Sequence, residues 1–256
     1  MAQADSNARL LGDEPFQFFE KFPSIQVAVD ADRKNGIEQL LSLPQKPEVI
    51  LLDDAFQHRK VKAGFYIVLT SYGDLYSDDF MLPTGNLRET RSGAKRADVV
   101  IVTKCPFDLS LDRQNDIRKE LKLAGNQQLY FTFIAYDTFI YGESRKINID
   151  KIQSVAKVLV TGIAKPEPFF TYLKNSNDVC LSFPDHHNFT EKDILEIKNS
   201  AQNNIIITTE KDYMRLKGSL PSEQLFYLPI KSAFISEKEN FDKTIIDYVG
   251  TSSRNR

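Results

Sequence analysis

The sequence predicts an α/β protein in which a mainly parallel sheet is covered by helices on both faces. Short apolar runs alternate along the chain with helical patterns, as in sheets whose strands are joined by crossover helices. Each run is too short for a helix, and several end in small or polar residues, as buried strands do. A chain of 256 residues with 41% apolar side chains is long enough to bury such a core.

The expected strands are rich in β-branched side chains, which favour extended backbone. In chain order they are residues 25–29, 49–52, 66–69, 99–102, 129–134, 158–160, 179–183 and 205–208. The stretch 136–150 is polar, and we expect it to be a surface connection or the join between two lobes.

Helical patterns fall between the expected strands. Residues 35–43 and 112–123 repeat apolar side chains at helical spacing. Residues 166–173 begin with a proline, which the first helical turn tolerates. Thr190 followed by Asp193 predicts a capping box that opens another helix. Residues 209–212 could be a further helix start with an acidic first turn.

The composition excludes several classes of protein. Thirty-three Lys and Arg residues against 35 Asp and Glu residues leave a net charge of −2, so we expect no nucleic-acid partner. Cys105 and Cys180 are far apart and form no CxxC motif, which argues against a disulfide framework or a zinc site and for small core side chains. The apolar runs are too short to span a membrane, which predicts a cytoplasmic protein.

The first candidate site follows the apolar run 49–52. Asp53 and Asp54 end this run, and two acids at the end of a buried strand can hold Mg²⁺ near phosphates. The alternative is a strand that simply ends in solvated acids. Gln57, His58 and Arg59 follow directly, and such a mixed polar cluster favours a functional role.

A second candidate is the Gly12–Pro15 segment, with Arg33 after the next apolar run. Pro15 favours an extended residue before it, so we expect Asp13 in a loop. The alternative is that Asp13 or Glu14 caps a helix over residues 16–21.

A third candidate is the segment 183–190. His186 and His187 suit proton transfer near neutral pH, and Asp185 could orient an imidazole. A chance pair of surface histidines is the alternative, and a metal site is less favoured because adjacent histidines rarely converge on one ion. In the glycine-containing loop 82–89, Arg88 could bind a phosphate or pair with an acid such as Glu89.

The chain contains no phosphate-binding loop of the G-x-x-x-x-G-K-[ST] type, because no glycine is followed by lysine. Seven segments nevertheless resemble, in this order, the tetraacyldisaccharide 4'-kinase family. They are GDEP (12–15), DADRKNG (30–36), ILLDDAFQHRKV (50–61), LPTGNLRE (82–89), AKRADVVIVTK (94–104), FPDHHNFT (183–190) and TTEKD (208–212). Members of this family phosphorylate the lipid A disaccharide precursor at the cytoplasmic face of the Gram-negative inner membrane.

The resemblance implies a P-loop-related α/β core with a smaller C-terminal α/β lobe, divided here as residues 1–145 and 146–250. It implies an ATP- and Mg²⁺-dependent phosphotransferase acting on an acylated glucosamine disaccharide phosphate. Residue by residue, it implies that Asp13 is catalytic and paired with His186, with Glu14 beside it. Asp53 and Asp54 match the magnesium-associated pair. The positions that match the active-site cleft are Arg33, Gln57, His58 and Arg88.

Family members normally begin with a membrane-associating helix and a phosphate loop, which this chain does not show. We therefore expect negligible kinase activity from this chain alone, and peripheral inner-membrane contact in a full-length protein. Two alternatives remain. One is a non-catalytic module that binds the lipid disaccharide. The other is a magnesium-dependent phosphoester hydrolase built on Asp13, Asp53, Asp54 and His186.

Overall fold

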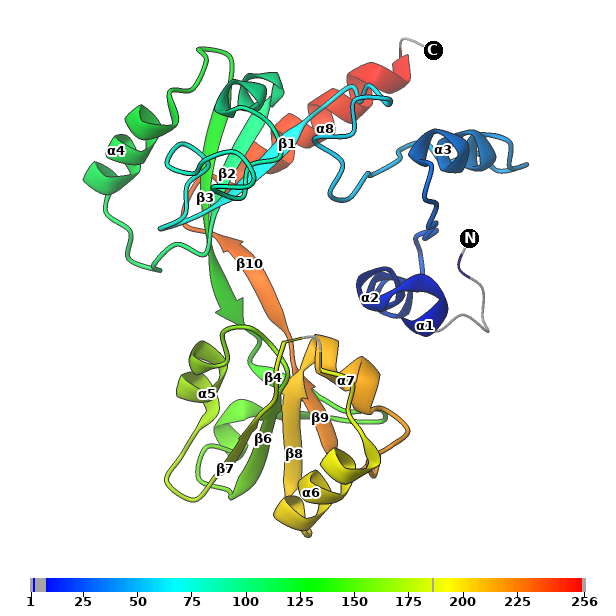
Figure 1. The fold of residues 1–256 in the computed structure, drawn as a ribbon, viewed down its shortest axis with the longest axis vertical. Coiled ribbons are helices and arrows are strands. Elements are labelled where there is room, and N and C mark those ends of the chain that lie inside the picture. The colour runs from blue at the N-terminus through cyan, green and yellow to red at the C-terminus, as the bar shows by residue number, and fades with distance from the viewer. Residues whose placement is uncertain (1, 3–7, 186, 255–256) are drawn as a thin grey trace. The chain divides into compact units, whose positions relative to one another are not determined.

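The computed structural model describes residues 2, 8–185 and 187–254. The chain forms two compact units, drawn in Figure 1. Unit 1 comprises Met1–Val29 and Tyr136–Lys231, and unit 2 comprises Asp30–Ala135 and Ser232–Arg256. The chain passes between the units after Val29, within the strand β3 and within the strand β10.

The sheet of unit 2 has the strand order β1-β2-β3-β10. Three strands run parallel, with Ile67 opposite Val99 and Val99 opposite Gln128. The strands are β1 (Ile67–Ser71), β2 (Val99–Thr103), β3 (Gln128–Tyr136) and β10 (Ile230–Phe234). The helices are α3 (Arg33–Leu41), α4 (Leu111–Leu121) and α8 (Lys238–Arg254), with the 3-10 helix η1 (Arg91–Arg96).

Both faces of this sheet are covered, because successive side chains of β2 point to opposite sides. Val100 and Val102 pack with Ile117 of α4 on one face. Val99 and Ile101 pack near Phe241 of α8 on the other. The sequence VVIVT is therefore almost wholly buried. The α4 helix begins at the N-cap Ser110, whose side chain accepts a hydrogen bond from the backbone N–H of Arg113.

The described residues of unit 1 form a sheet with the order β5-β4-β9-β8-β6-β7. Four strands run parallel, and the β4–β5 hairpin adds an antiparallel edge. The strands are β4 (Phe139–Tyr141), β5 (Lys146–Asn148), β6 (Lys157–Thr161), β7 (Val179–Ser182), β8 (Ile205–Thr209) and β9 (Leu225–Leu228). The helices are α1 (Ala8–Leu11), α2 (Asp13–Lys21), α5 (Glu167–Leu173), α6 (Glu191–Ala201) and α7 (Glu210–Leu216), with the 3-10 helix η2 (Ile149–Lys151).

Helices also lie on both faces of the unit 1 sheet. Phe169 and Leu173 of α5 pack with Leu159 and Ile207 on one face. The helices α6 and α7 pack on the other, where Ile197 is fully buried (Figure 1). The expected mainly parallel α/β architecture with helix-covered sheets is thus confirmed in each unit.

Six of the eight expected strands are present, but residues 25–29 and 49–52 are not strands. Both segments lack regular structure, and Leu51 is 91% exposed. A strand requires a ladder of hydrogen bonds to a neighbouring strand, and no described strand pairs with either segment. Val27 accepts one backbone hydrogen bond, from Ala2 at 2.8 Å. The stretch 136–150, which we expected to be a surface connection or the join between two lobes, contains the β4–β5 hairpin.

The two cysteines are free thiols, as expected. Cys105 is buried in the core of unit 2, and this burial raises the pKa of its thiol to about 11. Cys180 is half-buried against the core of unit 1. In the described part of the chain, no helix combines the length and the apolar character that a bilayer crossing needs.

A fully buried ion pair joins two segments of unit 1. The Lys157 ammonium lies 2.8 Å from the carboxylate of Asp178, and neither side chain is exposed to water. Asp178 also accepts hydrogen bonds from the backbone N–H groups of Lys157 and Asn175, at 3.1 and 2.8 Å. The pair therefore joins the start of β6 to the turn that precedes β7.

We predict that Lys157→Met destabilises unit 1 by about 3 to 5 kcal/mol, because it leaves a buried carboxylate without its cation. The control is Lys119→Met, which removes the exposed pair with Asp116 and should cost less than about 1 kcal/mol. Hydrogen exchange of the β6 and β8 amides measures the effect of Lys157→Met, and exchange of the α4 amides measures that of Lys119→Met. An equal loss of protection in the two variants would contradict the prediction.

Candidate active site

In unit 2, Asp53 and Asp54 lie in a sharp turn directly after the extended segment 49–52. Asp54 has a φ of 41°, a left-handed conformation that aspartate tolerates better than most residues. The guanidinium of Arg33, at the start of α3, donates to the backbone oxygens of Asp53 and Asp54 at 3.4 and 3.1 Å. Arg33 thereby holds the backbone of the turn, and both aspartates remain exposed.

Arg88 approaches the same turn from the loop after β1. Its Nη1 atom lies 4.0 Å from Oδ2 of Asp54. The neighbouring Glu89 instead binds Arg59 at 2.8 Å and Arg96 at 2.7 Å. The hydrogen bond from Arg96 is the main cause that holds the pKa of Glu89 below its usual value. Of the two alternatives for Arg88, the structure shows this side chain beside an acid, and that acid is Asp54 rather than Glu89.

Gln57 and His58 lie in the turn that follows the two aspartates. The backbone N–H of His58 donates to the oxygen of Ala55 at 2.9 Å, and that of Arg59 to the oxygen of Gln57 at 3.0 Å. The Nε2 atom of His58 is buried and has no hydrogen-bond partner among the described residues. Unit 2 thus brings Arg33, Asp53, Asp54 and Arg88 together, with Gln57 and His58 adjoining them in the chain.

In unit 1, Asp13 and Glu14 are the first residues of α2. Asp13 therefore does not lie in a loop, contrary to our expectation. Pro15 occupies the third helical position, where its missing N–H costs no helical hydrogen bond, so the helix can begin before it. The N-cap is Gly12, with a φ of 92° that suits glycine, and so neither acid is the cap.

Two ion pairs connect α2 to α7. The ammonium of Lys21 lies 2.8 Å from the buried carboxylate of Glu210, and that of Lys217, the residue that follows α7, lies 3.9 Å from Glu20. The helix that begins with Asp13 is therefore anchored to a helix that follows directly from the central strand β8. This contact joins α2 to the sheet and helices formed by the later part of unit 1.

The buried carboxylate of Asp212 organises the carboxyl edge of the unit 1 sheet. Its Oδ2 atom accepts hydrogen bonds from the backbone N–H of Gly162 and from the hydroxyl of Thr209, each at 2.8 Å. Gly162 follows β6, and Thr209 ends β8. Asp212 therefore connects two strand ends and the first turn of α7.

Asp212 also lies close to the loop after β7. Arg215 is 3.8 Å from Asp212 and donates to the backbone oxygen of His187 at 3.3 Å. The backbone N–H of Phe183 donates to the oxygen of Thr161 at 2.7 Å. In parallel sheets ligands bind beyond the carboxyl ends of the strands, so this loop is placed where a site is expected.

His187 has a structural environment. Its Nε2 atom lies 2.9 Å from Oδ2 of Asp193, and its ring stacks on Phe183 at a centroid distance of 5.1 Å. Asp193, rather than Asp185, therefore orients this imidazole. The carboxylate of Asp185 instead lies 4.0 Å from the ammonium of Lys211. His186 lies outside the described residues, so its pairing with Asp13 stays a prediction.

The expected capping box at the start of α6 is confirmed. Thr190 and Asp193 exchange side-chain to backbone hydrogen bonds in both directions. Hydrogen bonds from the Thr190 backbone, then from His187 and the Thr190 hydroxyl, lower the pKa of Asp193 to about 2. One carboxylate thus serves both the helix cap and the histidine loop.

Sequence reasoning did not identify the roles of Asp212, Arg215 and Gly162. The only signal was Thr209 followed by Asp212, which indicates a helix start and nothing about a strand 50 residues away. The predicted site residues belong to different units. Asp13 and Glu14 belong to unit 1, and the remaining predicted residues that the structure describes belong to unit 2. Those of unit 2 are Arg33, Asp53, Asp54, Gln57, His58 and Arg88.

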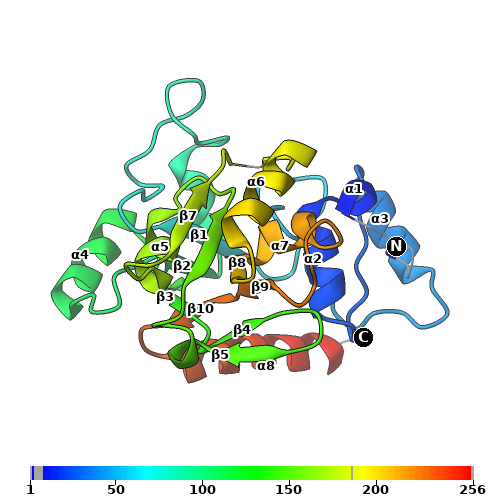
Figure 2. The same cartoon turned by 90° about the horizontal axis from the view of Figure 1, so that it is seen from below.

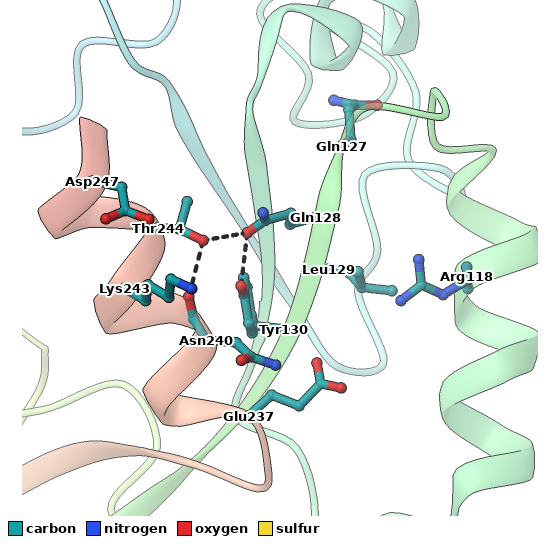
Figure 3. A pocket seen from close by; sticks show the side chains of 10 residues that line it. All are labelled: Arg118, Gln127, Gln128, Leu129, Tyr130, Glu237, Asn240, Lys243, Thr244 and Asp247. Atoms are coloured by element: carbon teal, nitrogen blue, oxygen red, sulfur yellow. Dashed lines mark hydrogen bonds between the residues drawn. The ribbon is translucent and has the colours of Figure 1, made fainter. Parts of the chain in front are cut away.

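A polar cavity of about 440 Å³ lies in unit 2 beside α8 and the start of β3 (Figure 3). Gln128 accepts hydrogen bonds there from Tyr130 at 2.7 Å and from Thr244 at 2.9 Å (Figure 3). These groups satisfy one another, and the cavity lies at the amino end of β3. Because ligands bind at carboxyl ends of parallel strands, we do not assign this cavity to the active site.

We predict that Asp212→Ala destabilises unit 1 by about 3 kcal/mol, because one buried and one half-buried donor lose their acceptor. The Gly162 amide should then exchange with solvent much faster than in the unaltered protein. Asp116→Ala, in exposed surface, is the control and should change neither quantity. An Asp212→Ala protein in which the Gly162 amide stays protected would contradict this assignment.

We predict a pH effect at the histidine loop from Asp193. Its pKa is lowered in the folded state, so it stabilises the fold above about pH 4, and this contribution disappears as the pH falls to about 2. NMR of the Asp193 carboxyl group should give a titration midpoint near pH 2. Thr190→Ala should raise this midpoint, because it removes the hydroxyl that donates to the carboxylate. Asp193→Asn should remove this resonance, and a midpoint near 4 in the unaltered protein would refute the prediction.

Comparison with known proteins gives one consistent result. The family model described as tetraacyldisaccharide-1-P 4'-kinase (LpxK) matches residues 1–249. The tetraacyldisaccharide 4'-kinase of Flavobacterium johnsoniae is 63% identical over 249 residues, covering 97% of this chain and 73% of that protein. The enzyme of Flavobacterium psychrophilum is 60% identical over 257 residues, covering 100% and 75%.

A solved structure agrees with these relatives. The crystal structure of LpxK from Aquifex aeolicus in complex with ATP matches with a TM-score of 0.71 and 25% identity, covering 96% of this chain and 71% of that one. This confirms the expected P-loop-kinase-like α/β fold. The ordered motifs, the fold and the sequence relatives agree, and the chain belongs to the tetraacyldisaccharide-1-P 4'-kinase family.

Proposed function

We propose that this protein transfers the γ-phosphoryl group of ATP to the 4'-hydroxyl of a tetraacyldisaccharide 1-phosphate in lipid A biosynthesis. Family membership supports a kinase with this acceptor. ATP is supported by the related LpxK structure, which contains it. The acceptor suggests that the protein works at the cytoplasmic face of the inner membrane, in peripheral contact with it.

The observation that carries the proposal is the turn at Asp53 and Asp54. Arg33 binds the backbone oxygens of both residues and leaves their carboxylates exposed. Such a turn presents two negative groups on a fixed backbone, with the cationic Arg88 4.0 Å from one of them. An arginine beside two carboxylates suits a phosphate that arrives with a divalent cation.

These residues fit Mg²⁺. In kinases Mg²⁺ is bound by one or two carboxylates together with substrate phosphates and water, rather than by a cage of protein ligands. Asp53 and Asp54 would hold the ion, and bound Mg²⁺ would neutralise negative charge on the phosphate oxygens.

Asp13 is the proposed base. In the transfer, the 4'-oxygen forms a bond to the γ-phosphorus, the bond to the ADP oxygen breaks, and the hydroxyl proton passes to Asp13. Its backbone position at the start of α2 is anchored to unit 1 through Lys21 and Glu210. His186 would assist Asp13, and Glu14 adjoins it in the chain.

Gln57, His58 and Arg88 are proposed to contact nucleotide or phosphate. The buried Nε2 atom of His58 is without a partner among the described residues, so it can accept or donate one further hydrogen bond. A bound phosphate oxygen or water is a suitable partner. Arg33 is proposed to act by holding the aspartate turn rather than by direct contact.

We predict that, in a full-length protein, Asp13→Asn and Asp54→Asn each lower phosphorylation of the acceptor at least about 100-fold, because one removes the base and the other a magnesium ligand. Mass spectrometry of the extracted lipid, with ATP and MgCl₂ present, measures the product. Asp54→Asn should also raise the Mg²⁺ concentration needed for half-maximal rate, whereas Asp13→Asn should not.

Asp116→Asn, an exposed aspartate on α4, is the matched control and should retain the full rate. A full-length protein with this sequence unaltered that gives no phosphorylated lipid would contradict the proposed function. Full activity of Asp13→Asn would contradict only the role of Asp13.

A further inference from the structure

The loop after β1 carries three consecutive apolar side chains in water. Phe80, Met81 and Leu82 are 62, 47 and 60% exposed. Residues 80–87 contain no charged side chain. Figure 2 shows this loop, in teal, extending away from the strands of its own unit. Contiguous exposed apolar side chains often mark an interaction site, whereas single exposed apolar side chains are common on any protein surface.

The backbone of the loop is held by its own hydrogen bonds. The N–H of Leu82 donates to the oxygen of Leu87 at 2.9 Å, and the N–H of Leu87 to the oxygen of Phe80 at 3.0 Å. The N–H groups of Thr84 and Gly85 both donate to the oxygen of Met81. The tip is therefore a closed turn that keeps its shape without a partner.

Asp79 and Gly85 fix the base of this turn. The carboxylate of Asp79 accepts from the backbone N–H groups of Phe80 and Asn86 at 2.7 and 3.1 Å, which lowers its pKa. A Cβ atom at Gly85 would come within 2.3 Å of the Phe80 oxygen, so only glycine fits. The Arg91 guanidinium lies over the Phe80 ring, 5.3 Å from its centre, and Arg91 also donates to the Asp79 oxygen.

This architecture prevents the apolar side chains from folding back onto the protein. The same loop ends at Arg88, which lies 4.0 Å from Asp54. The apolar tip is thus continuous in the chain with the proposed phosphate site. An acceptor with four acyl chains is held in a bilayer, so its phosphorylation requires the site to reach a bilayer surface.

We propose that Phe80, Met81 and Leu82 insert into the hydrocarbon of a lipid bilayer and place the neighbouring phosphate site at the level of the lipid headgroups. This inference rests on the proposed function, because the acylated acceptor supplies the reason for a bilayer partner. The uncharged tip indicates apolar insertion rather than attraction to anionic lipid. Binding through this loop should therefore persist in uncharged phosphatidylcholine and at high salt.

The absence of tryptophan from the chain gives a direct test. In Phe80→Trp the new indole is the sole tryptophan and reports on the loop tip. On addition of phosphatidylcholine vesicles its emission should shift to the blue, and vesicles with brominated acyl chains should quench it. Leu195→Trp, on α6 of unit 1, is the control, since Leu195 is 58% exposed and lies outside the loop. It should show neither effect.

Vesicle sedimentation provides the second measurement. Phe80→Ser should lower the partition coefficient about tenfold or more, because a phenylalanine side chain loses its transfer into hydrocarbon. Leu82→Ser should lower it as well, whereas Leu195→Ser should leave it unchanged. In a full-length protein, Phe80→Ser should still phosphorylate acceptor dispersed in detergent micelles, because the loop tip does not contact the reacting groups.

Three results would overturn the inference. The first is that the emission of Phe80→Trp does not shift to the blue when vesicles are added. The second is that high salt abolishes vesicle binding. The third is an emission shift that occurs without vesicles and grows with protein concentration, which would indicate that the loop contacts a second copy of the chain. Failure of the proposed function is distinguishable. It would appear as no phosphorylation of micellar acceptor by the unaltered full-length protein, whatever the vesicle result.

Discussion

The carboxylate of Asp212 is the constraint on which the functional edge of unit 1 depends. It accepts hydrogen bonds from the residue after β6 and from the last residue of β8, and Asp212 itself lies in the first turn of α7. A buried carboxylate is costly unless its oxygens are bonded, so the strand ends cannot separate cheaply. The proposed catalytic helix α2 and the histidine loop both attach to this region, through Glu210 and Arg215. Asp212 therefore fixes the strand ends beside which both elements attach.

Unit 2 fixes its site by the opposite arrangement. There a cation, Arg33, binds two backbone oxygens, and the acids of the same turn stay exposed. Glu89 gathers Arg59 and Arg96, which leaves Arg88 directed to Asp54. Charged groups that hold the backbone are thus separate from those proposed to meet phosphate. This division keeps the site rigid while its reactive groups remain accessible to substrate.

Local patterns predicted local structure well. The capping box at Thr190 and Asp193 was readable because both partners lie within one helical turn. The apolar run 99–102 became a buried strand because it has a neighbour on each side. Residues 49–52 are equally apolar but have no described neighbouring strand, and they are not a strand. Our expectation that Asp13 lies in a loop was wrong. A residue before proline prefers extended backbone, but the first turn of a helix accepts proline, and at Pro15 the second effect prevails.

The sequence by itself determined the fold class, the family resemblance and the acids at 53 and 54, since all of these depend on residue order. The tertiary structure decided which partners those residues have. It assigned His187 to Asp193, Glu89 to two arginines and Asp212 to Gly162. The physical reason is that hydrogen bonds and ion pairs form between atoms a few ångströms apart. Groups separated by many residues reach that distance only when the sheets have brought their strand ends together.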